Sequence, residues 1–130
     1  MYLHAALITA LTTVLLGFAM GLVGRARGLH GVHAPATSGH PDFERAFRAH
    51  MNTIEQLAMF LPVFWVATVH FDAMIAAWVG YAWLVGRFWY IVGYVRAAEK
   101  RSMGFLVGAL CYLALLVMAL WGIGRAFLAG

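Results

Sequence analysis

The sequence predicts an all-α integral membrane protein, a four-helix bundle that forms one domain over all 130 residues. Hydrophobic residues make up 64% of the chain and charged residues only 11%, and the mean hydropathy is +0.83. Soluble domains carry roughly 25% charged residues, so this composition indicates a membrane protein. The apolar residues also gather in four runs, each close to the roughly 20 residues that a membrane-spanning helix needs.

The four predicted spans cover residues 3–23, 51–69, 73–95 and 105–123. The first run is followed, not preceded, by its arginines, which is unlike a signal peptide. We expect the second helix to begin ahead of its span, at Phe43 or Glu44, with Asp42 as its cap. Pro62 predicts a kink in that helix. The connection from Gly28 to Pro41 is rich in Gly, His and Pro and predicts an irregular loop.

Glycines recur along these spans and predict close packing between helices in lipid. The glycines concerned are Gly17, Gly21, Gly80, Gly86, Gly93, Gly104 and Gly108. The histidines of the first loop, His30, His33 and His40, do not have the spacing of a metal site, so no metal centre is predicted. Cys111 has no cysteine to pair with and lies in an apolar run, which predicts a packing role.

The basic residues predict an orientation in the membrane. They lie between spans one and two and between spans three and four: Arg25, Arg27, Arg45, Arg48, Arg96, Lys100 and Arg101. The opposite side has only a short turn and Arg125. The positive-inside rule therefore places both basic connections in the cytoplasm. The Ala- and Gly-rich composition favours a bacterial inner membrane. The formal charge of +4 lies beside apolar runs, so membrane lipid is the expected partner and nucleic acid is not.

A polar stripe enters the second span. Arg48, Asn52 and Glu55 follow spacings of four and three, so they share one face of a helix. Polar and charged groups at the edge of hydrocarbon are costly unless they face protein, water or a polar ligand. This face is therefore a candidate site.

A second stripe matches the first on the third span. Arg87, Tyr90, Tyr94 and Arg101 align on one face if that helix continues past Val95. Spans two and three are antiparallel, so the two stripes are expected to meet at the same depth. One reading is a structural Glu55–Arg87 ion pair without a ligand. The surplus of donors and cations favours a second reading, a site for a small, polar, multiply anionic ligand.

These residues resemble the MAPEG family, the membrane-associated proteins of eicosanoid and glutathione metabolism. The segment His33-Ala34-Pro35, followed by GHPDFERAFRAHMNTIE at residues 39–55, looks like the family signature. The segment RFWYIVGY at residues 87–94, followed by Arg101, resembles the second motif, particularly that of the leukotriene-forming glutathione transferases. The resemblance covers nearly the whole chain, with four spans and similar loop lengths.

The resemblance implies a homotrimer that binds glutathione between neighbouring subunits at the cytoplasmic side. Carried over by position, the residues implied to bind glutathione are Arg48, Asn52, Glu55, Tyr90 and Tyr94, with Arg27 and His50 from the adjoining subunit and Arg87 on the floor. Arg101 matches the arginine that stabilises the glutathione thiolate. The implied activity is a membrane transferase that conjugates glutathione to lipophilic electrophiles, with reduction of lipid hydroperoxides as a related reaction.

Two residues depart from the leukotriene-forming pattern. Gln56 stands where those members have an aromatic residue, and Gly28 replaces a second arginine near the acceptor. Two other functions stay open on the sequence. One is a non-catalytic lipid-binding or scaffolding protein of the same fold, which the presence of Arg101 disfavours. The other is a small exporter with Glu55 as its proton-coupled carboxylate, which the surrounding cations disfavour because they keep Glu55 ionised.

Overall fold

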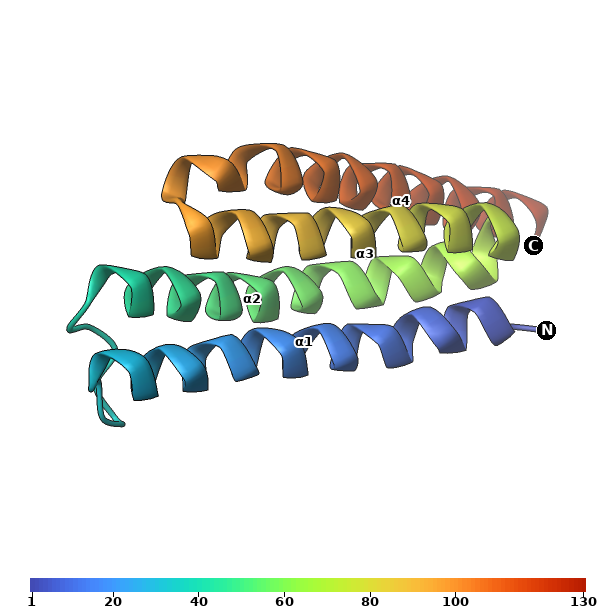
Figure 1. Cartoon of the computed structure of the whole chain (residues 1–130). Helices are drawn as coiled ribbons and strands as arrows, with labels where there is room; N and C mark the ends of the chain where they lie inside the picture. Colours follow the sequence, from blue (N-terminus) through green and yellow to red (C-terminus); the bar gives the residue numbers. More distant parts are fainter.

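The computed structural model describes all 130 residues and contains four long helices and one short 3₁₀ helix. In chain order they are α1 (Leu3–His30), α2 (Pro41–His70), α3 (Ala73–Arg96), η1 (Ala98–Arg101) and α4 (Ser102–Ala129). The four long helices lie side by side, and both termini lie at the same end of the bundle (Figure 1). Each is long and apolar enough to cross a membrane. The predicted all-α four-helix fold is confirmed.

The first connection is shorter than predicted. Helix α1 continues to His30, and Gly31 then adopts a left-handed conformation with φ of 64° that ends the helix. Helix α2 begins at Pro41, where proline suits the first helical turn. The predicted cap was wrong: the ring of His40, not Asp42, caps the helix by accepting the backbone N–H of Asp42 at 3.1 Å. Helix α2 continues through Pro62 to His70.

The third helix ends earlier than the polar stripe predicted. Helix α3 stops at Arg96, and Ala97 is extended before η1 begins. Arg101 is therefore not on the same helix as Tyr94, and that prediction was wrong. The chain turns back at this point because Gly93 has no side chain: a Cβ there would meet the backbone carbonyl of Lys100. Helix η1 consequently packs directly against the end of α3.

Most of the predicted glycine contacts are present. An added Cβ would clash with neighbouring side chains at Gly80 and with neighbouring backbone at Gly104, where it would meet the backbone of Tyr90. Helices α3 and α4 therefore approach closely beside Tyr90. Gly17 and Gly21 differ, because nothing lies within 4 Å of a Cβ at either position. These two glycines face outward and make no close helix contact within one chain.

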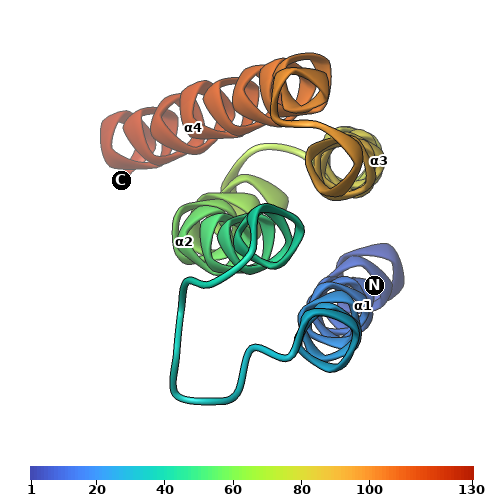
Figure 2. The ribbon, with the colours of Figure 1, turned by 60° about the vertical axis from the view of Figure 1, so that its left-hand side comes forward.

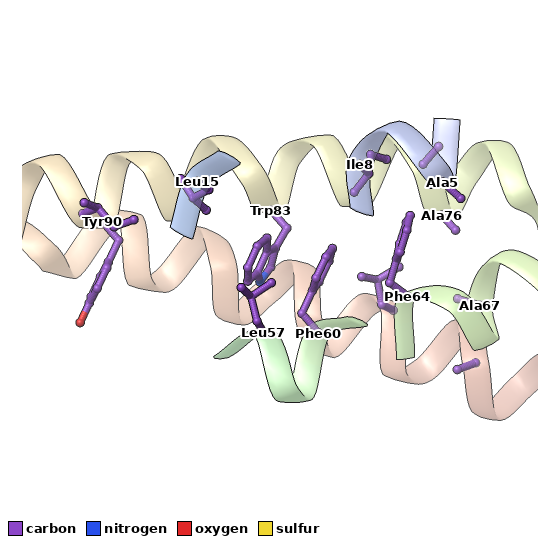
Figure 3. Close-up of a cluster of buried hydrophobic side chains, with 14 of the residues drawn as sticks. Ala5, Ile8, Leu15, Leu57, Phe60, Phe64, Ala67, Ala76, Trp83 and Tyr90 are labelled. Atoms are coloured by element: carbon purple, nitrogen blue, oxygen red, sulfur yellow. The ribbon is translucent and has the colours of Figure 1, made fainter. Parts of the chain in front are cut away.

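The core lies along α2 and α3 and is covered by α1 on one side and α4 on the other (Figure 2). Phe60 and Trp83 stack with ring centroids 4.0 Å apart, and Phe64 stacks on Phe60 (Figure 3). Tyr90 lies at the end of this cluster and its hydroxyl points away from it (Figure 3). Only 33 of 130 residues are buried, so most of the apolar side chains face outward, as in a protein surrounded by lipid.

Charge is unequally distributed between the two ends of the bundle. The loop of residues 31–40 and η1 lie together at one end (Figure 1). We call this the basic end, because the arginines and the lysine of both connections are there, whereas Arg125 lies near the opposite end. The cytoplasmic placement of the basic end stays a prediction.

Candidate active site

The two predicted polar stripes meet at the basic end of the bundle. They line a cleft of about 370 Å³ between α2, α3, η1 and α4. We call it the tyrosine cleft; its lining residues are Arg48, Met51, Asn52, Glu55, Tyr90, Tyr94, Arg101 and Phe105. Six of these eight were predicted as site residues from the sequence. The wall from α2 follows the helical spacing of Arg48, Asn52 and Glu55.

Arg87 lies behind the cleft and not on its surface. Its side chain is almost completely buried, at 1% exposure, within the membrane-spanning part of α3. Its Nη2 donates to Asn52 Oδ1 at 2.8 Å and to Thr53 Oγ1 at 3.0 Å. The guanidinium carbon also lies 3.9 Å from the centroid of the Tyr90 ring. Arg87 therefore orients two residues of the cleft wall, Asn52 and Tyr90, from beneath.

Glu55 does not pair with Arg87. The two ion pairs in the structure are His30–Asp42 and Arg45–Asp42, so Arg87 has only neutral partners. Glu55 is instead exposed in the wall of the cleft. The ligand-free reading of the stripe, a structural Glu55–Arg87 ion pair, is therefore wrong. The carboxylate of Glu55 is free to receive a cationic group of a ligand.

Arg101 reaches the cleft by a route that the sequence did not predict. It is the last residue of η1, and its guanidinium carbon lies 4.9 Å from the centroid of the Tyr94 ring. Tyr94 in turn meets Tyr90 edge to face, with centroids 5.6 Å apart. The cation–π contact holds a positive charge at the mouth of the cleft. The 3₁₀ turn thus replaces the predicted helical continuation while leaving Arg101 beside Tyr94.

Arg27 and His50 do not line the cleft of their own chain. Arg27 donates to the backbone carbonyls of Val32 at 3.4 Å and Ala36 at 2.8 Å, and it lies over the ring of Phe43. His50 is half-buried on α2 but lies outside the set of cleft residues. The contribution of both residues from a neighbouring subunit stays a prediction.

The first loop brings together His30, His40 and Asp42, a contact that was not predicted from the sequence. The rings of His30 and His40 stack with centroids 3.7 Å apart, and His30 Nε2 lies 3.6 Å from Asp42 Oδ2. Their potential ligand atoms lie within 4.8 Å of one another, as a metal site would require. However, His40 Nδ1 accepts the Asp42 backbone N–H, and Asp42 also pairs with Arg45. These contacts join the end of α1 to the start of α2.

Sequence reasoning missed three residues of the site. Met51 and Phe105 add apolar walls to the cleft, and Thr53 accepts a hydrogen bond from Arg87. Phe105 lies four residues after Arg101, so helical spacing could have indicated it. Thr53 follows Asn52 directly but is fully buried, and no local pattern connects it with Arg87. Because apolar walls lie beside charged groups, the cleft suits a polar ligand that meets an apolar reaction partner there.

Similarity to known proteins identifies the family of this chain. The sequence profile of the MAPEG family matches residues 2–121. The chain belongs to the MAPEG family. Its relatives include a microsomal glutathione S-transferase 2 of Mus musculus, 39% identical over 82% of this chain and 72% of that protein. A leukotriene C4 synthase of Cavia porcellus is 37% identical over 95% of this chain and 82% of that protein.

An uncharacterised protein of Synechocystis sp. is also similar, with 50% identity over 93% of this chain and 88% of that protein. The family match over residues 2–121 takes in α1, α2, α3 and most of α4. Family membership and four apolar helices together identify the chain as a multi-pass integral membrane protein.

Proposed function

We propose that this MAPEG protein is a glutathione-dependent membrane transferase and that the tyrosine cleft binds glutathione. The observation that carries the proposal is the content of the cleft: two guanidinium groups, one carboxylate, one amide and two phenols in about 370 Å³. The named activities of the mammalian relatives, a glutathione S-transferase and leukotriene C4 synthase, support the same function.

The groups of glutathione match those of the cleft. The tripeptide carries two carboxylates and one ammonium at neutral pH. Arg48 is positioned to bind a carboxylate bidentately, and Glu55 to accept hydrogen bonds from the ammonium. Asn52, held by Arg87, and the hydroxyls of Tyr90 and Tyr94 can satisfy the peptide groups. The ligand's mixed charge explains why the cleft keeps a free carboxylate among its arginines.

Arg101 is the proposed catalytic residue. A free thiol has a pKa of about 8.5, so only a few per cent is thiolate at neutral pH. The guanidinium of Arg101 would favour the thiolate by charge, because arginine does not act as a base. The thiolate forms a bond to the electrophilic carbon of the acceptor while the leaving group departs with its electron pair. With a hydroperoxide, the thiolate would attack the terminal oxygen and break the O–O bond, and the alkoxide would leave and take up a proton to become the alcohol. The glutathione sulfenic acid formed in this step would then react with a second glutathione to give the disulfide and water.

We propose a homotrimer as the active assembly, with Arg27 and His50 completing the cleft of a neighbouring subunit. Neither residue lines its own cleft, although both lie in the basic half of the bundle. Co-assembly tests this arrangement: Arg27→Ala and Arg101→Ala subunits, each inactive alone, should regain activity when mixed. Mixed assemblies that stay inactive would contradict a contribution of Arg27 across the interface.

Calorimetric titration of the purified protein with glutathione tests the proposed ligand. We expect one site per chain, and we expect Glu55→Gln to weaken binding because the ammonium loses its anionic partner. Glu99→Gln, on η1 outside the cleft, is the matched control and should bind normally. Absence of binding at millimolar glutathione would overturn the proposal. Binding without turnover of aryl halides or hydroperoxides would favour the non-catalytic alternative, a lipid-binding or scaffolding protein.

A further inference from the structure

A second surface of the molecule has no part in the proposed transferase site. Helices α1 and α3 form an apolar groove of about 450 Å³, and all the residues that line it are hydrophobic. Val14 and Val85 on its walls are 64% and 66% exposed, and Phe18 and Phe88 pack together across it with centroids 5.5 Å apart. The tyrosine cleft lies elsewhere, between α2, α3 and α4.

A cationic pocket lies between this groove and the basic end of the bundle. Its volume is about 310 Å³, and Arg25 from α1, Arg45 from α2 and Arg96 from α3 converge on it. We call it the arginine pocket. Asp42 is its one acidic residue and already pairs with Arg45, so with His30 neutral the three arginines leave the pocket with a net charge of +2. Arg25 and Arg96 have no ion-pair partner within the chain.

The groove leads into the arginine pocket. Helices α1 and α3 are parallel in sequence direction, since both run from the opposite end of the bundle toward the basic end (Figure 1). On α1, Phe18 of the groove precedes Leu22 and Arg25 of the pocket at helical spacing. The seven residues from Phe18 to Arg25 rise about 10 Å, the distance from hydrocarbon into the headgroup region. Polarity therefore changes along this surface in the same order as in a phospholipid.

We propose that this surface binds one anionic phospholipid, with its phosphodiester in the arginine pocket and an acyl chain in the groove between α1 and α3. Arginine suits the phosphodiester because its planar donors bind two phosphate oxygens at once. Basic pockets between membrane helices bind anionic headgroups for the same reason. A zwitterionic lipid fits the groove equally well, but its ammonium gains nothing from three arginines.

Charge also distinguishes a lipid from a second copy of the chain as the occupant. The whole chain has only five acidic residues. Of these, Asp42 already belongs to the pocket, and Asp72 caps α3 at the opposite end of the bundle. The other three are Glu55, which lines the cleft, and Glu44 and Glu99, so a neighbouring copy offers at most two unassigned carboxylates to three arginines. A bilayer that contains anionic phospholipid offers headgroups of net negative charge at this depth.

Native mass spectrometry of the delipidated protein in detergent tests the proposal. We expect phosphatidylglycerol to bind once per chain and more tightly than phosphatidylcholine. Arg25→Gln/Arg96→Gln should weaken phosphatidylglycerol binding by about 25-fold, about fivefold for each charge, and abolish the preference. Val85→Trp should weaken both lipids by filling the groove. Val117→Trp on α4 is its control, since Val117 has the same 66% exposure as Val85.

Three outcomes would overturn the proposal. Unchanged phosphatidylglycerol binding by the double arginine variant would show that the pocket does not hold the headgroup. Displacement of the lipid by millimolar inorganic phosphate, together with normal binding by Val85→Trp, would identify a site for free phosphate. A change of assembly mass in Val85→Trp with unaltered lipid binding would show that a second copy covers the groove. Circular dichroism and gel filtration of each variant confirm that it is folded.

Discussion

The tyrosine cleft and the arginine pocket are both cationic and both lie at the basic end, but their arginines are held differently. In the cleft, Arg101 stacks on Tyr94, and Arg87 is fixed beneath by Asn52 and Thr53. In the arginine pocket, Arg25 and Arg96 are exposed and have no hydrogen-bond or ion-pair partner. Arg48 in the cleft also has no partner, and Arg45 in the pocket is paired with Asp42. The contrast is therefore between Arg87 and Arg101 at the cleft and Arg25 and Arg96 at the pocket.

This difference indicates two kinds of recognition. Ordering side chains before binding reduces the entropy lost on binding and rejects ligands of the wrong shape. Such a cleft suits a tripeptide whose charged groups have fixed separations and whose thiol must be placed for reaction. Exposed arginines without partners at a membrane surface select for charge alone, which suits headgroups of variable conformation. The comparison predicts that changes to the supporting residues damage the cleft and leave the pocket intact.

The largest expected effect is on turnover in Arg101→Ala. Removing a preorganised charge that stabilises a reacting anion lowers the rate constant by about 100-fold or more. Arg96→Ala is the matched control, because Arg96 lies five residues earlier at the same basic connection but in the other site. Stopped-flow ultraviolet absorbance of the bound thiolate and steady-state kcat measure the effect. Equal loss of kcat in both variants would mean that general surface charge, and not the position of Arg101, promotes the reaction.

The next effect is on stability and concerns the close approach of α3 and α4 beneath the cleft. In Gly104→Ala the new methyl group would meet the backbone of Tyr90, which cannot move aside. We expect a loss of about 2 kcal/mol in the free energy of unfolding, typical of overpacking. Gly124→Ala lies on the same helix with open space around it and should be neutral or stabilising by up to about 1 kcal/mol.

Unfolding in mixed detergent micelles, followed by circular dichroism, measures both glycine variants. Phosphatidylglycerol binding should survive in Gly104→Ala, because the arginine pocket lies on α1, α2 and the end of α3. A stable Gly104→Ala protein with normal glutathione affinity would show that the helices separate without disturbing the cleft. That result would remove the argument that helix packing holds its residues in place.

A third effect separates binding from stability at Arg87. The guanidinium is buried in a membrane span and has no anionic partner, so its desolvation is poorly compensated. Arg87→Met should therefore unfold at the same or a higher detergent concentration than the wild type. Glutathione affinity should nevertheless fall about tenfold, because Asn52 loses a charged hydrogen-bond donor and its fixed orientation. If Arg87→Met lost stability and glutathione affinity together, the main role of Arg87 would be to stabilise the fold and not to orient Asn52.

The outline of the fold was predictable from the sequence because the bilayer restricts the choice of structure. Four apolar runs of sufficient length require four helices, and all four are present. Helical spacing likewise predicted the wall formed by Arg48, Asn52 and Glu55, since all three lie on one uninterrupted helix. Periodicity is reliable where a regular helix continues.

The errors arose where a tertiary contact decides the local structure. The alignment of Arg101 with Tyr94 required the third helix to continue past Val95, but the contact of Gly93 with Lys100 folds the chain back into η1. Which residues would meet Arg87 was likewise not predicted: the less favoured reading paired it with Glu55, but it donates to Asn52 and to Thr53 on the buried face of α2. Neither choice depends on spacing along one helix. Both depend on which side chain of a neighbouring element lies opposite. The spacing of residues along a single sequence does not reveal that contact.

The smallest effect isolates a single hydrogen bond to Arg87. Thr53 and Thr68 are both buried on α2, and each donates its hydroxyl to the carbonyl four residues earlier. Only Thr53 also accepts a hydrogen bond from Arg87. Thr53→Val should lower glutathione affinity by about fivefold, equivalent to about 1 kcal/mol, while Thr68→Val should have no effect on it. Calorimetric titration compares the two variants directly. Equal glutathione affinities of Thr53→Val and Thr68→Val would mean that Asn52 alone positions Arg87. The order of the tyrosine cleft would then depend on one hydrogen bond to Arg87 and not on two.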